Sequence, residues 1–416
     1  MLAVKYRTKK GFLNNFTALH MVVPTLRCNS NCRYCQVSRK DINAVGSDMD
    51  KSTAKRTVDM MFTSPSPDIK IEFQGGEPLL NFKIVKYIIE YAEWKNLFKK
   101  INLQFVLCTN LTLINKDILK YLKKHRVYIS TSLDGFKELH NQNRPLQSTD
   151  NSYDIVIEKL NMCRGYLGHD GVSALMTASR FSMGRFKEII DEYLNHGFDN
   201  IFLRSLNPYG YARRDKEKLG YGINEYTEGY IDALNYIIDL NLKGIYISES
   251  YAALLLTRIL TPFSTGFVDM QSPAGVGISG VIYDYNGNVY VSDEARMLAS
   301  IGDYRFLMGN VNQNSYLEIF NSEFLHSLIS SSCLECLPGC SDCAYQSFCG
   351  ADPVRNYSEH GDIIGNRTTS DLCKKNKLII HYLLELIKKQ DPNIDNIFWS
   401  WIRRKPLKTP ICLEQS

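Results

Sequence analysis

Short apolar runs alternate with longer amphipathic stretches along roughly the first 245 residues of the chain. The short runs are rich in β-branched and aromatic residues, which favours strands, and six of them have a length typical of buried strands. Apolar positions at helical intervals follow most of these runs, most clearly over 81–98, 115–126, 184–197 and 223–244. The six predicted strands span 18–26, 69–75, 102–110, 127–133, 172–179 and 200–207.

This alternation of strands and helices predicts an α/β fold with a parallel sheet and right-handed crossovers, closed or partly closed as a barrel. In such folds the loops after the strands converge on one mouth, where the chemistry gathers. One motif follows each of the first four predicted strands, so we expect these motifs to meet there. They are RCNSNCRYC (27–35), GGEP (75–78), Thr109-Asn110 and SLDG (132–135).

Beyond residue 262 the pattern changes to a stretch rich in Gly, Ser and Pro, followed by an alternation typical of a hairpin over 281–294. Asn286-Gly287, between the two arms, indicates a type I′ turn. A cysteine-rich loop comes next, and a helix is predicted from about Lys374. We therefore divide the chain into an N-terminal extension (1–17), a barrel (18–245) and a second, cysteine-rich domain with a C-terminal helix (246–416).

Composition narrows the class of protein. With 44% hydrophobic and 22% charged residues, the 416-residue chain is typical of a soluble globular protein. Its formal net charge of +5 is spread without a Lys/Arg block, so a nucleic-acid partner is not indicated. The sequence shows neither an apolar stretch of membrane-spanning length nor a signal peptide, so we expect a cytoplasmic protein without a membrane partner.

Nine of the twelve cysteines fall into two clusters. A long chain without a secretory signal is expected in a reducing compartment, which favours metal binding over disulfides. The first cluster, Cys28, Cys32 and Cys35, has the spacing C-x3-C-x2-C and no fourth cysteine nearby. Zinc sites and iron–sulfur clusters normally take four protein ligands. Three thiols therefore leave one metal position open.

This spacing, with Tyr34 just before the last cysteine and GGEP after the next strand, resembles the signature of the radical S-adenosylmethionine superfamily. The resemblance covers residues 18 to about 245 and implies a partial (β/α)6 TIM-type barrel. It also implies that the three thiolates hold a [4Fe-4S] cluster whose open iron binds the methionyl end of S-adenosylmethionine (SAM). Reductive cleavage of SAM then gives a 5′-deoxyadenosyl radical, which abstracts hydrogen from a substrate.

The same resemblance places further side chains around SAM. Gly75 and Gly76 let the backbone come close to a ligand, and Glu77 offers a carboxylate to the methionyl ammonium. Arg144 is expected to meet the methionyl carboxylate. The other expected cofactor contacts are Tyr34 at the adenine, Ser132 and Asp134 near the ribose and methionyl parts, and Asn110 after the third strand.

The second cluster has the pattern C-x2-C-x5-C with one more cysteine after a gap, which resembles the auxiliary-cluster part of the SPASM domain. Four thiolates can close a [4Fe-4S] cluster without an open site, which suits electron transfer. A zinc ion with four thiolate ligands fits the count equally well. We interpret an extra C-x2-C, Cys333 and Cys336, as a remnant in a loop. The predicted ligands are Cys340, Cys343, Cys349 and Cys373.

Family members with two auxiliary clusters carry further cysteines, one before the hairpin and two at positions that are Ser292 and Pro353 here. The resemblance therefore implies a single auxiliary [4Fe-4S] cluster. In sulfatase maturases an aspartate directly follows the second cysteine of this set and takes a proton from the substrate. Asp293 holds that place and is the candidate catalytic residue, although a carboxylate after a hairpin is more often a solvated turn residue.

Three further stretches, 289–297, 343–357 and 360–373, resemble maturases of the His-Xaa-Ser peptide system. The expected function is modification of a ribosomally made precursor peptide, by cross-linking, oxidation or epimerisation. Electrons are expected from an external ferredoxin- or flavodoxin-type donor. Because the short N-terminus leaves no room for a leader-binding module, we expect a partner maturase or a leader-binding adaptor to supply recognition.

Two alternative functions stay open. One is an anaerobic sulfatase-maturating type of enzyme, which forms formylglycine. The missing cysteines count against it, because that group carries two auxiliary clusters. The other is a non-catalytic iron–sulfur or zinc scaffold, which would not need GGEP beside three cysteines.

Overall fold

The computed structural model describes residues 2–14, 16–367 and 369–406. Its main feature is a nine-stranded sheet in the order β11-β10-β9-β1-β2-β3-β4-β5-β7, in which the seven strands from β9 to β7 run parallel. The strands are β1 (Leu19–Val22), β2 (Asp68–Phe73), β3 (Asn102–Cys108), β4 (Val127–Ser132), β5 (Val172–Thr177), β7 (Leu203–Arg204), β9 (Gly280–Tyr283), β10 (Asn288–Tyr290) and β11 (Leu307–Asn310).

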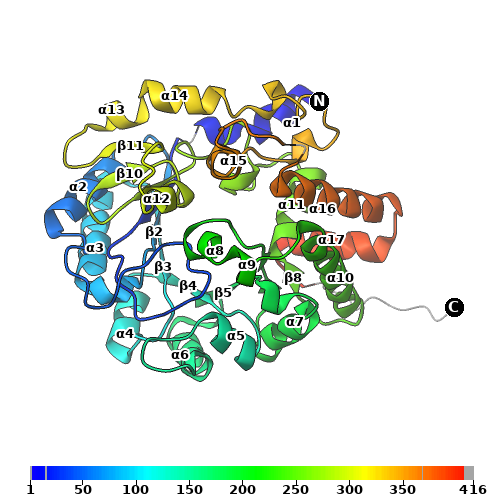
Figure 1. The fold of residues 1–416 in the computed structure, drawn as a ribbon, viewed down its shortest axis with the longest axis horizontal. Coiled ribbons are helices and arrows are strands. Elements are labelled where there is room, and N and C mark those ends of the chain that lie inside the picture. The colour runs from blue at the N-terminus through cyan, green and yellow to red at the C-terminus, as the bar shows by residue number, and fades with distance from the viewer. Residues whose placement is uncertain (1, 15, 368, 407–416) are drawn as a thin grey trace.

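Helices surround the central strands (Figure 1). Each predicted helix is present, and α3 shows why: its apolar residues recur at helical spacing between Ile84 and Ala92 and are buried. The α-helices are α1 (Leu2–Lys9), α2 (Lys51–Met61), α3 (Phe82–Lys99), α4 (Lys116–Lys124), α5 (Lys137–Asn143), α6 (Ser152–Leu167), α7 (Phe186–Asn195), α8 (Gly210–Arg214), α9 (Lys216–Leu219), α10 (Ile223–Leu242), α11 (Ser250–Leu260), α12 (Asp293–Ala299), α13 (Tyr316–Phe320), α14 (Glu323–Ser330), α15 (Pro353–His360), α16 (Asp371–Lys388) and α17 (Pro392–Arg403). None of the helices in the described part of the chain is long and apolar enough to cross a membrane.

The predicted α/β class and the six predicted strands are confirmed, but the sixth strand is broken. Residues 200–207 contain β6 (Asn200–Ile201) and β7 as separate short strands. β7 continues the main sheet beside β5, whereas β6 pairs with β8 (Ser248–Glu249) in a two-stranded sheet. The buried Glu249 side chain accepts a hydrogen bond from the Leu203 N–H (3.1 Å) and so links the two sheets at the break.

The predicted hairpin is present, but its turn is not the predicted one. The Gly287 N–H donates to the Asp284 carbonyl (2.9 Å), which closes the turn between β9 and β10. Gly287 has a φ of +87°, whereas Asn286 does not have a positive φ. A type I′ turn needs a positive φ at both central residues, so that prediction is wrong. The Asn-Gly signal located the turn, but glycine alone takes the left-handed conformation.

The hairpin continues the barrel sheet rather than starting a new one. β9 pairs in parallel with β1, with Leu19 opposite Gly280 and Val22 opposite Tyr283. Behind this pairing the ring of the buried His20 stacks on Tyr283, and His20 Nδ1 lies 3.1 Å from the Tyr283 hydroxyl. The segment after residue 262 and the barrel therefore share one sheet. The division of the chain at residue 245 stays a prediction.

Two C-terminal helices pack on the barrel at the end of the sheet far from α2 and α3 (Figure 1). α16 confirms the helix predicted from about Lys374, although it begins at Asp371, with Ser370 as its N-cap. α17 follows it and buries Phe398 and Trp401. Both helices contact α10 and α11, which follow the broken sixth strand.

Candidate active site and cysteine clusters

The first three cysteines lie on the long loop that follows β1, which we call the cysteine loop (23–48). Its base is closed where the Cys28 N–H donates to the Lys40 carbonyl (3.1 Å), and its tip turns where the Cys35 N–H donates to the Cys32 carbonyl (3.2 Å). Cys28 is 6% exposed, while Cys32 and Cys35 are half-buried. The backbone thus brings the three predicted ligands to one end of the barrel.

The three thiols are near enough to affect one another's ionisation. Burial raises the pKa of the Cys28 thiol to about 12, and Glu77 and the other two cysteines add to the shift. Burial raises the pKa of the Cys32 thiol to about 11, while the Arg144 guanidinium opposes it. Among the described residues, no three metal-ligating side chains stand close enough for a single ion. The spacing suits a four-iron cluster better, because irons and sulfides separate its thiolates.

The glycine pair after β2 passes directly beside the chain that leads into the cysteine loop. Gly75 has a φ of +120°, and a Cβ there would stand 2.5 Å from the Thr25 carbonyl oxygen. A Cβ on Gly76 would overlap the Arg27 carbonyl. The Gly76 N–H donates to Thr25 (3.0 Å) and the Glu77 N–H to Arg27 (2.8 Å). The close approach that requires glycine is therefore to the protein's own backbone.

Glu77 is buried, at 1% exposure, and its carboxylate is held by three donors. The Leu79 N–H (3.1 Å) and the Thr109 hydroxyl (2.8 Å) donate to Oε1, and the Asn110 N–H (2.9 Å) donates to Oε2. Burial raises the pKa of this carboxyl to about 7, although the three hydrogen bonds oppose the shift. Glu77 thus ties the end of β3 to the GGEP turn, and its contact with SAM stays a prediction.

Asn110 connects the end of β3 to the cysteine loop. Its side-chain amide donates to Asn29 Oδ1 (2.9 Å) and to the Ser30 hydroxyl (2.8 Å). Its own oxygen accepts from the Thr112 hydroxyl (2.7 Å). Thr109-Asn110, singled out because it follows a strand, therefore positions the residues around Cys28.

Tyr34, Asp134 and Arg144 form one group, in which Tyr34 and Asp134 are buried and Arg144 is half-buried. The Tyr34 hydroxyl donates to Asp134 (2.5 Å), whose other oxygen lies 3.1 Å from Arg144 Nε. The Arg144 guanidinium lies 5.1 Å from the centre of the Tyr34 ring, and Nη1 lies 4.0 Å from Cys32 Sγ. Asp134 is fully buried, and Ser132 ends β4 two residues before it. The structure brings these predicted contacts together, but the sequence did not indicate that three of them pair with one another.

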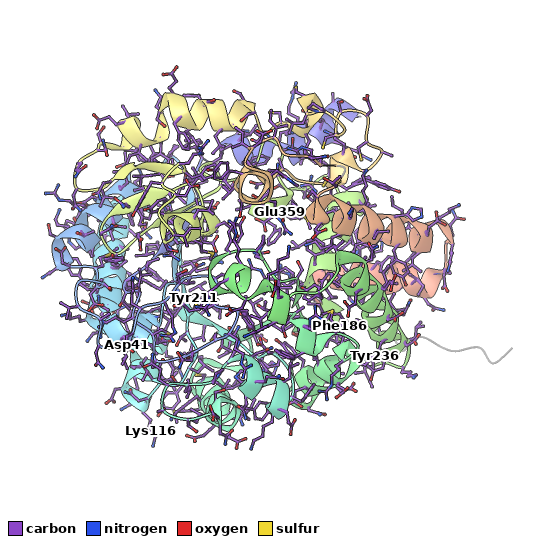
Figure 2. All side chains as sticks on the ribbon, in the orientation of Figure 1. Asp41, Lys116, Phe186, Tyr211, Tyr236 and Glu359 are labelled. Atoms are coloured by element: carbon purple, nitrogen blue, oxygen red, sulfur yellow. The ribbon has the colours of Figure 1, made fainter. Side chains whose placement is uncertain are left out.

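The segment with α8 and α9 lies over the cysteine loop, and sequence reasoning missed this contact. The Tyr211 N–H donates to the Cys35 carbonyl (2.9 Å), and Gly210, with a φ of +54°, passes so close to that loop that a Cβ would overlap it. The Tyr34 ring packs with Ala212 and Leu219 in a small apolar cluster. Tyr211 lies near the centre of the molecule in Figure 2.

The four predicted C-terminal ligands also come together. Cys340 and Cys343 lie in turns before the short helix η7 (Gln346–Phe348), Cys349 directly follows it, and Cys373 lies in the first turn of α16. All four are free and half-buried. Burial raises the pKa of the Cys340 and Cys373 thiols, and the other cysteines of the set raise both further. As at the first site, these thiols lie near one another without standing close enough for a single ion, and their spacing likewise suits a four-iron cluster.

A buried arginine holds the loop around Cys349. Arg258 of α11 donates from Nε to the Phe348 carbonyl (3.0 Å) and from Nη2 to the Cys349 carbonyl (3.2 Å). The Asn376 amide lies 3.5 Å from Cys349 Sγ and accepts from the Tyr251 hydroxyl (2.6 Å). Sequence reasoning missed both residues, because neither Arg258 nor Asn376 lies in a recognisable motif.

Asp293, the candidate catalytic residue, is the first residue of α12. Ser292 caps this helix, because its side chain accepts a hydrogen bond from the Ala295 N–H (3.2 Å). Asp293 is half-buried and adjoins Glu294, whose pKa is raised by burial and then by the charge of Asp293. The structure thus places Asp293 beside a second carboxylate at a helix start.

A small cavity of about 40 Å³ lies next to Glu294 and was not predicted. Its lining includes Asp269, Glu294 and Asp352, which face Arg204 at the end of β7 and Lys375 of α16. Burial raises the pKa of all three carboxyls, with neighbouring carboxylates adding to the shift, and lowers that of Lys375 to about 8. No sequence signal joins these residues, because they come from separate segments.

Residues 22–193 match the family model described as the Radical SAM superfamily. This range begins at the last residue of β1 and holds β2 to β5, the cysteine loop, Glu77 and the group around Asp134. Residues 22–193 are therefore a radical SAM domain, a domain of an enzyme superfamily, and the C-terminal region resembles SPASM. The superfamily's cofactors are a [4Fe-4S] cluster and SAM, as predicted from the sequence.

Two relatives show how far the likeness extends. An uncharacterised protein of Methanocaldococcus jannaschii is 30% identical over 190 residues, and this match spans 45% of our chain and 63% of that protein's length. The cysteine-type anaerobic sulfatase-maturating enzyme of Clostridium novyi is 24% identical over 344 residues, which are 79% of our chain and 85% of that enzyme. The second likeness is longer than the barrel and so continues past residue 245.

A solved structure described as native anSMEcpe with bound AdoMet and Cp18Cys peptide has the same fold. It matches with a TM-score of 0.73 over 90% of our chain and 99% of that chain, at 18% sequence identity. The shared fold confirms the predicted TIM-type partial barrel, continued by a C-terminal region with cysteines.

Proposed function

We propose that this radical SAM enzyme modifies a ribosomally made peptide, by a hydrogen abstraction that leads to a cross-link, an oxidation or an epimerisation. The observation that supports this most is that Cys28, Cys32 and Cys35 share one barrel mouth with Glu77 and Arg144. When bound, the reduced cluster and SAM supply a 5′-deoxyadenosyl radical at that mouth. The protein supplies binding, orientation and exclusion of water.

The buried Glu77 and the half-buried Arg144 are suited to the ammonium and the carboxylate of the methionyl part of SAM. A carboxylate has about four acceptor positions. Glu77 uses three of them on the protein, which leaves one for the methionyl ammonium. Arg144 forms an ion pair with Asp134, with Nε 3.1 Å from the carboxylate, and we assign its terminal nitrogens to the methionyl carboxylate. In this proposal Asp134 and Tyr34 act as positioning residues, because they fix the guanidinium beside Cys32.

We assign Cys340, Cys343, Cys349 and Cys373 to a single auxiliary [4Fe-4S] cluster. The two positions where a second cluster would take cysteines serve helix starts instead. Ser292 caps α12, and Pro353 is the first residue of α15, where a missing N–H costs nothing. A zinc ion is the competing occupant of the four-cysteine site, and metal analysis separates the two.

The second candidate function is formylglycine formation of the sulfatase-maturating type. The likeness to the Clostridium novyi enzyme, over 79% of our chain, favours it. We place it second because Ser292 and Pro353 stand where two-cluster enzymes have ligands. Both functions use the same barrel site, so the product distinguishes them.

Asp293 is our candidate proton acceptor. It is half-buried at the start of α12, beside Glu294, whose pKa burial raises well above its usual range. We expect Asp293→Asn to cleave SAM normally and to form modified peptide at least tenfold more slowly. Parental product formation by this variant would contradict the role, and Glu323→Gln, an exposed helix-start carboxylate, is the control.

The proposed partners follow from the chemistry. One electron per cleavage must come from outside, and we assign this to a ferredoxin- or flavodoxin-type donor. The substrate is a precursor peptide, and a partner maturase or a leader-binding adaptor is proposed to bring it to the barrel.

The deciding experiment incubates anaerobically reconstituted enzyme with SAM, dithionite and candidate peptides, namely any short peptide encoded beside its gene and a cysteine peptide of sulfatase type. We expect 5′-deoxyadenosine, together with loss of hydrogen from the short peptide or exchange of a Cα hydrogen with solvent. An aldehyde on the cysteine peptide, trapped by a hydrazide, would favour the second candidate. No 5′-deoxyadenosine from fully reconstituted enzyme would contradict both.

A further inference from the structure

An open cavity of about 830 Å³ lies between the cysteine loop and the α8–α9 segment. Cys32 is part of its wall, and we call the cavity the basic basin because five of its lining side chains are cationic. Tyr211, which also lines it, marks its place near the centre of Figure 2. The cationic residues are Arg33, Arg39, Arg180, Arg214 and Lys218.

The basin carries an excess of positive charge. Only two acidic residues, Asp215 and Glu217, line it against the five cationic ones, which leaves a formal excess of three. Asp215 is already paired with Arg214 (2.6 Å). Arg33 and Lys218 are exposed, and within the described residues neither has a carboxylate at ion-pair distance. Much of the chain's net charge of +5 is thus concentrated at one opening.

The position of Cys32 places this positive charge next to the predicted cluster site. Cys32 forms part of the basin wall and, on its inner side, lies 4.0 Å from Arg144 Nη1, so it separates the basin from the buried group around Asp134. The opposite wall is fixed to the cysteine loop where the Tyr211 N–H donates to the Cys35 carbonyl (2.9 Å). A protein seated in the basin would therefore touch a thiol of the predicted cluster site.

We propose that the basic basin is the docking surface for a small acidic one-electron carrier protein. This inference rests on the proposed function. One electron leaves the reduced flavin or iron–sulfur centre of the carrier, which becomes oxidised, and enters the cluster, which becomes reduced; no bond or proton is exchanged. Electron-transfer encounters bury little surface and depend on complementary charge, which a wide basic opening supplies.

An acidic peptide is the other partner that such charge attracts. The residues that line the basin favour the carrier over the peptide. Cys32, a predicted cluster ligand, is part of the wall. Glu77, which would hold the methionyl end of SAM, is buried and is not part of the wall. A substrate must reach SAM itself, while a carrier needs to reach only the edge of the cluster.

The test uses a double charge reversal, Arg33→Glu with Lys218→Glu, in the full reconstituted enzyme. The probe is an acidic bacterial flavodoxin, and its Kd is measured by calorimetry at low and at high salt. We expect at least tenfold weaker binding by the variant at low salt, and a parental affinity that falls steeply as salt screens the charges. SAM cleavage driven by flavodoxin and its reductase should fall at least tenfold, while cleavage driven by dithionite stays within twofold.

The matched control is Lys116→Glu with Lys123→Glu, which makes the same charge change on exposed residues of α4. Lys116 lies at the rim of the molecule in Figure 2, well away from Tyr211.

Equal loss of binding in the control would overturn the proposal, and so would parental affinity in the basin variant. Loss of dithionite-driven cleavage in the basin variant would place the basin in the SAM site instead. Unchanged flavodoxin binding with lost binding of the precursor peptide would assign it to the peptide. Absence of any peptide product contradicts the proposed function but leaves these carrier measurements intact.

Discussion

The two cysteine sites differ in how the rest of the chain holds them. Around Cys28, the ends of β2 and β3 are tied to the cysteine loop by the buried Glu77 and by the amide of Asn110. The four C-terminal cysteines sit half-buried on short turns and at a helix start, and Arg258 holds that loop through backbone carbonyls. The barrel site is built from residues at the ends of strands, whereas the C-terminal site is formed by a loop and a helix start that surround the four cysteines.

The difference follows from what each site has to do. An open iron must present one position to SAM at a fixed angle to the substrate, so the protein has to hold the surrounding groups rigidly. A cluster with four thiolate ligands only has to be enclosed, and metal binding itself supplies much of the order of such a loop. We therefore expect substitutions at the barrel mouth to change SAM chemistry, and substitutions in the second site to change metal content and stability.

The largest expected effect comes from removing the three barrel thiols together. Cys28→Ala, Cys32→Ala and Cys35→Ala in one variant should abolish 5′-deoxyadenosine formation under dithionite, because nothing else on the loop can hold the cluster. The iron content should fall from about eight to about four atoms per chain. Chromatography of 5′-deoxyadenosine with iron and sulfide assays measures both. SAM cleavage at the parental rate would contradict the assignment of these three cysteines as cluster ligands.

Removing the other four thiols should separate the two sites. The variant with alanine at all four C-terminal ligands should keep SAM cleavage, lose product formation on the peptide and retain about four irons. Its melting temperature should fall, because the loop loses its metal. About twelve irons in the parent would mean a third cluster. Zinc in place of the last four irons would make this site structural. The ligands in question are Cys340, Cys343, Cys349 and Cys373.

Glu77→Gln tests the strand-built site with a change of one charge. Loss of a charge-assisted contact should weaken SAM binding by about 1.5–3 kcal/mol, roughly ten- to a hundredfold. Calorimetry on the reconstituted enzyme measures this, and circular dichroism checks that the variant folds. Glu225→Gln, at an exposed position on α10, should bind SAM like the parent. If Glu77→Gln binds SAM with the parental affinity, this carboxylate stabilises the GGEP turn but does not bind SAM.

Tyr34→Phe should have a smaller effect. It removes the hydroxyl that donates to Asp134 (2.5 Å) and keeps the ring, so the buried carboxylate loses a hydrogen bond worth about 1.5–3 kcal/mol. The melting temperature should fall by a few degrees and SAM affinity by less than in Glu77→Gln, because Arg144 still holds Asp134. Thermal unfolding beside the exposed-site control Tyr128→Phe measures this. An unchanged melting temperature would mean that the hydroxyl does not hold the group.

The smallest effect is expected from Cys333→Ala with Cys336→Ala. Cys336 is exposed and Cys333 half-buried, and we interpret the pair as a remnant outside both sites. Stability should change by less than about 0.5 kcal/mol and the iron content should stay at the parental value. Iron analysis after reconstitution decides the point. Loss of iron from this variant would show that the second site is larger than four cysteines.

Much of the fold could be predicted from the sequence, because local patterns encode it. Apolar runs located all six barrel strands, and helical spacing located α3, α4, α7 and α10. The break at Phe202 could not be predicted, because it depends on which strand each half meets. The pairing of β9 with β1 is likewise a tertiary choice, and no local signal encodes it.

The candidate site was predicted as a set of positions rather than as a geometry. Motif spacing brought the cysteines, Glu77 and Asn110 to one mouth, because loops after parallel strands converge. It did not show that Arg144 pairs with Asp134, nor that Gly76 is needed for contact with Arg27. Those features depend on distances between segments, which a single sequence does not contain.

The pairing of β1 with β9 also determines when the sheet can be completed during synthesis of the chain. Leu19 lies opposite Gly280, so the strand made first on the ribosome gains its second neighbour only when most of the chain has been made. Contacts between such distant segments form slowly, and until then one edge of β1 presents unpaired backbone groups to other chains. A fragment that ends near residue 245 would keep that edge bare. Recombinant production of the barrel alone should therefore give aggregates at concentrations where the whole chain remains in solution.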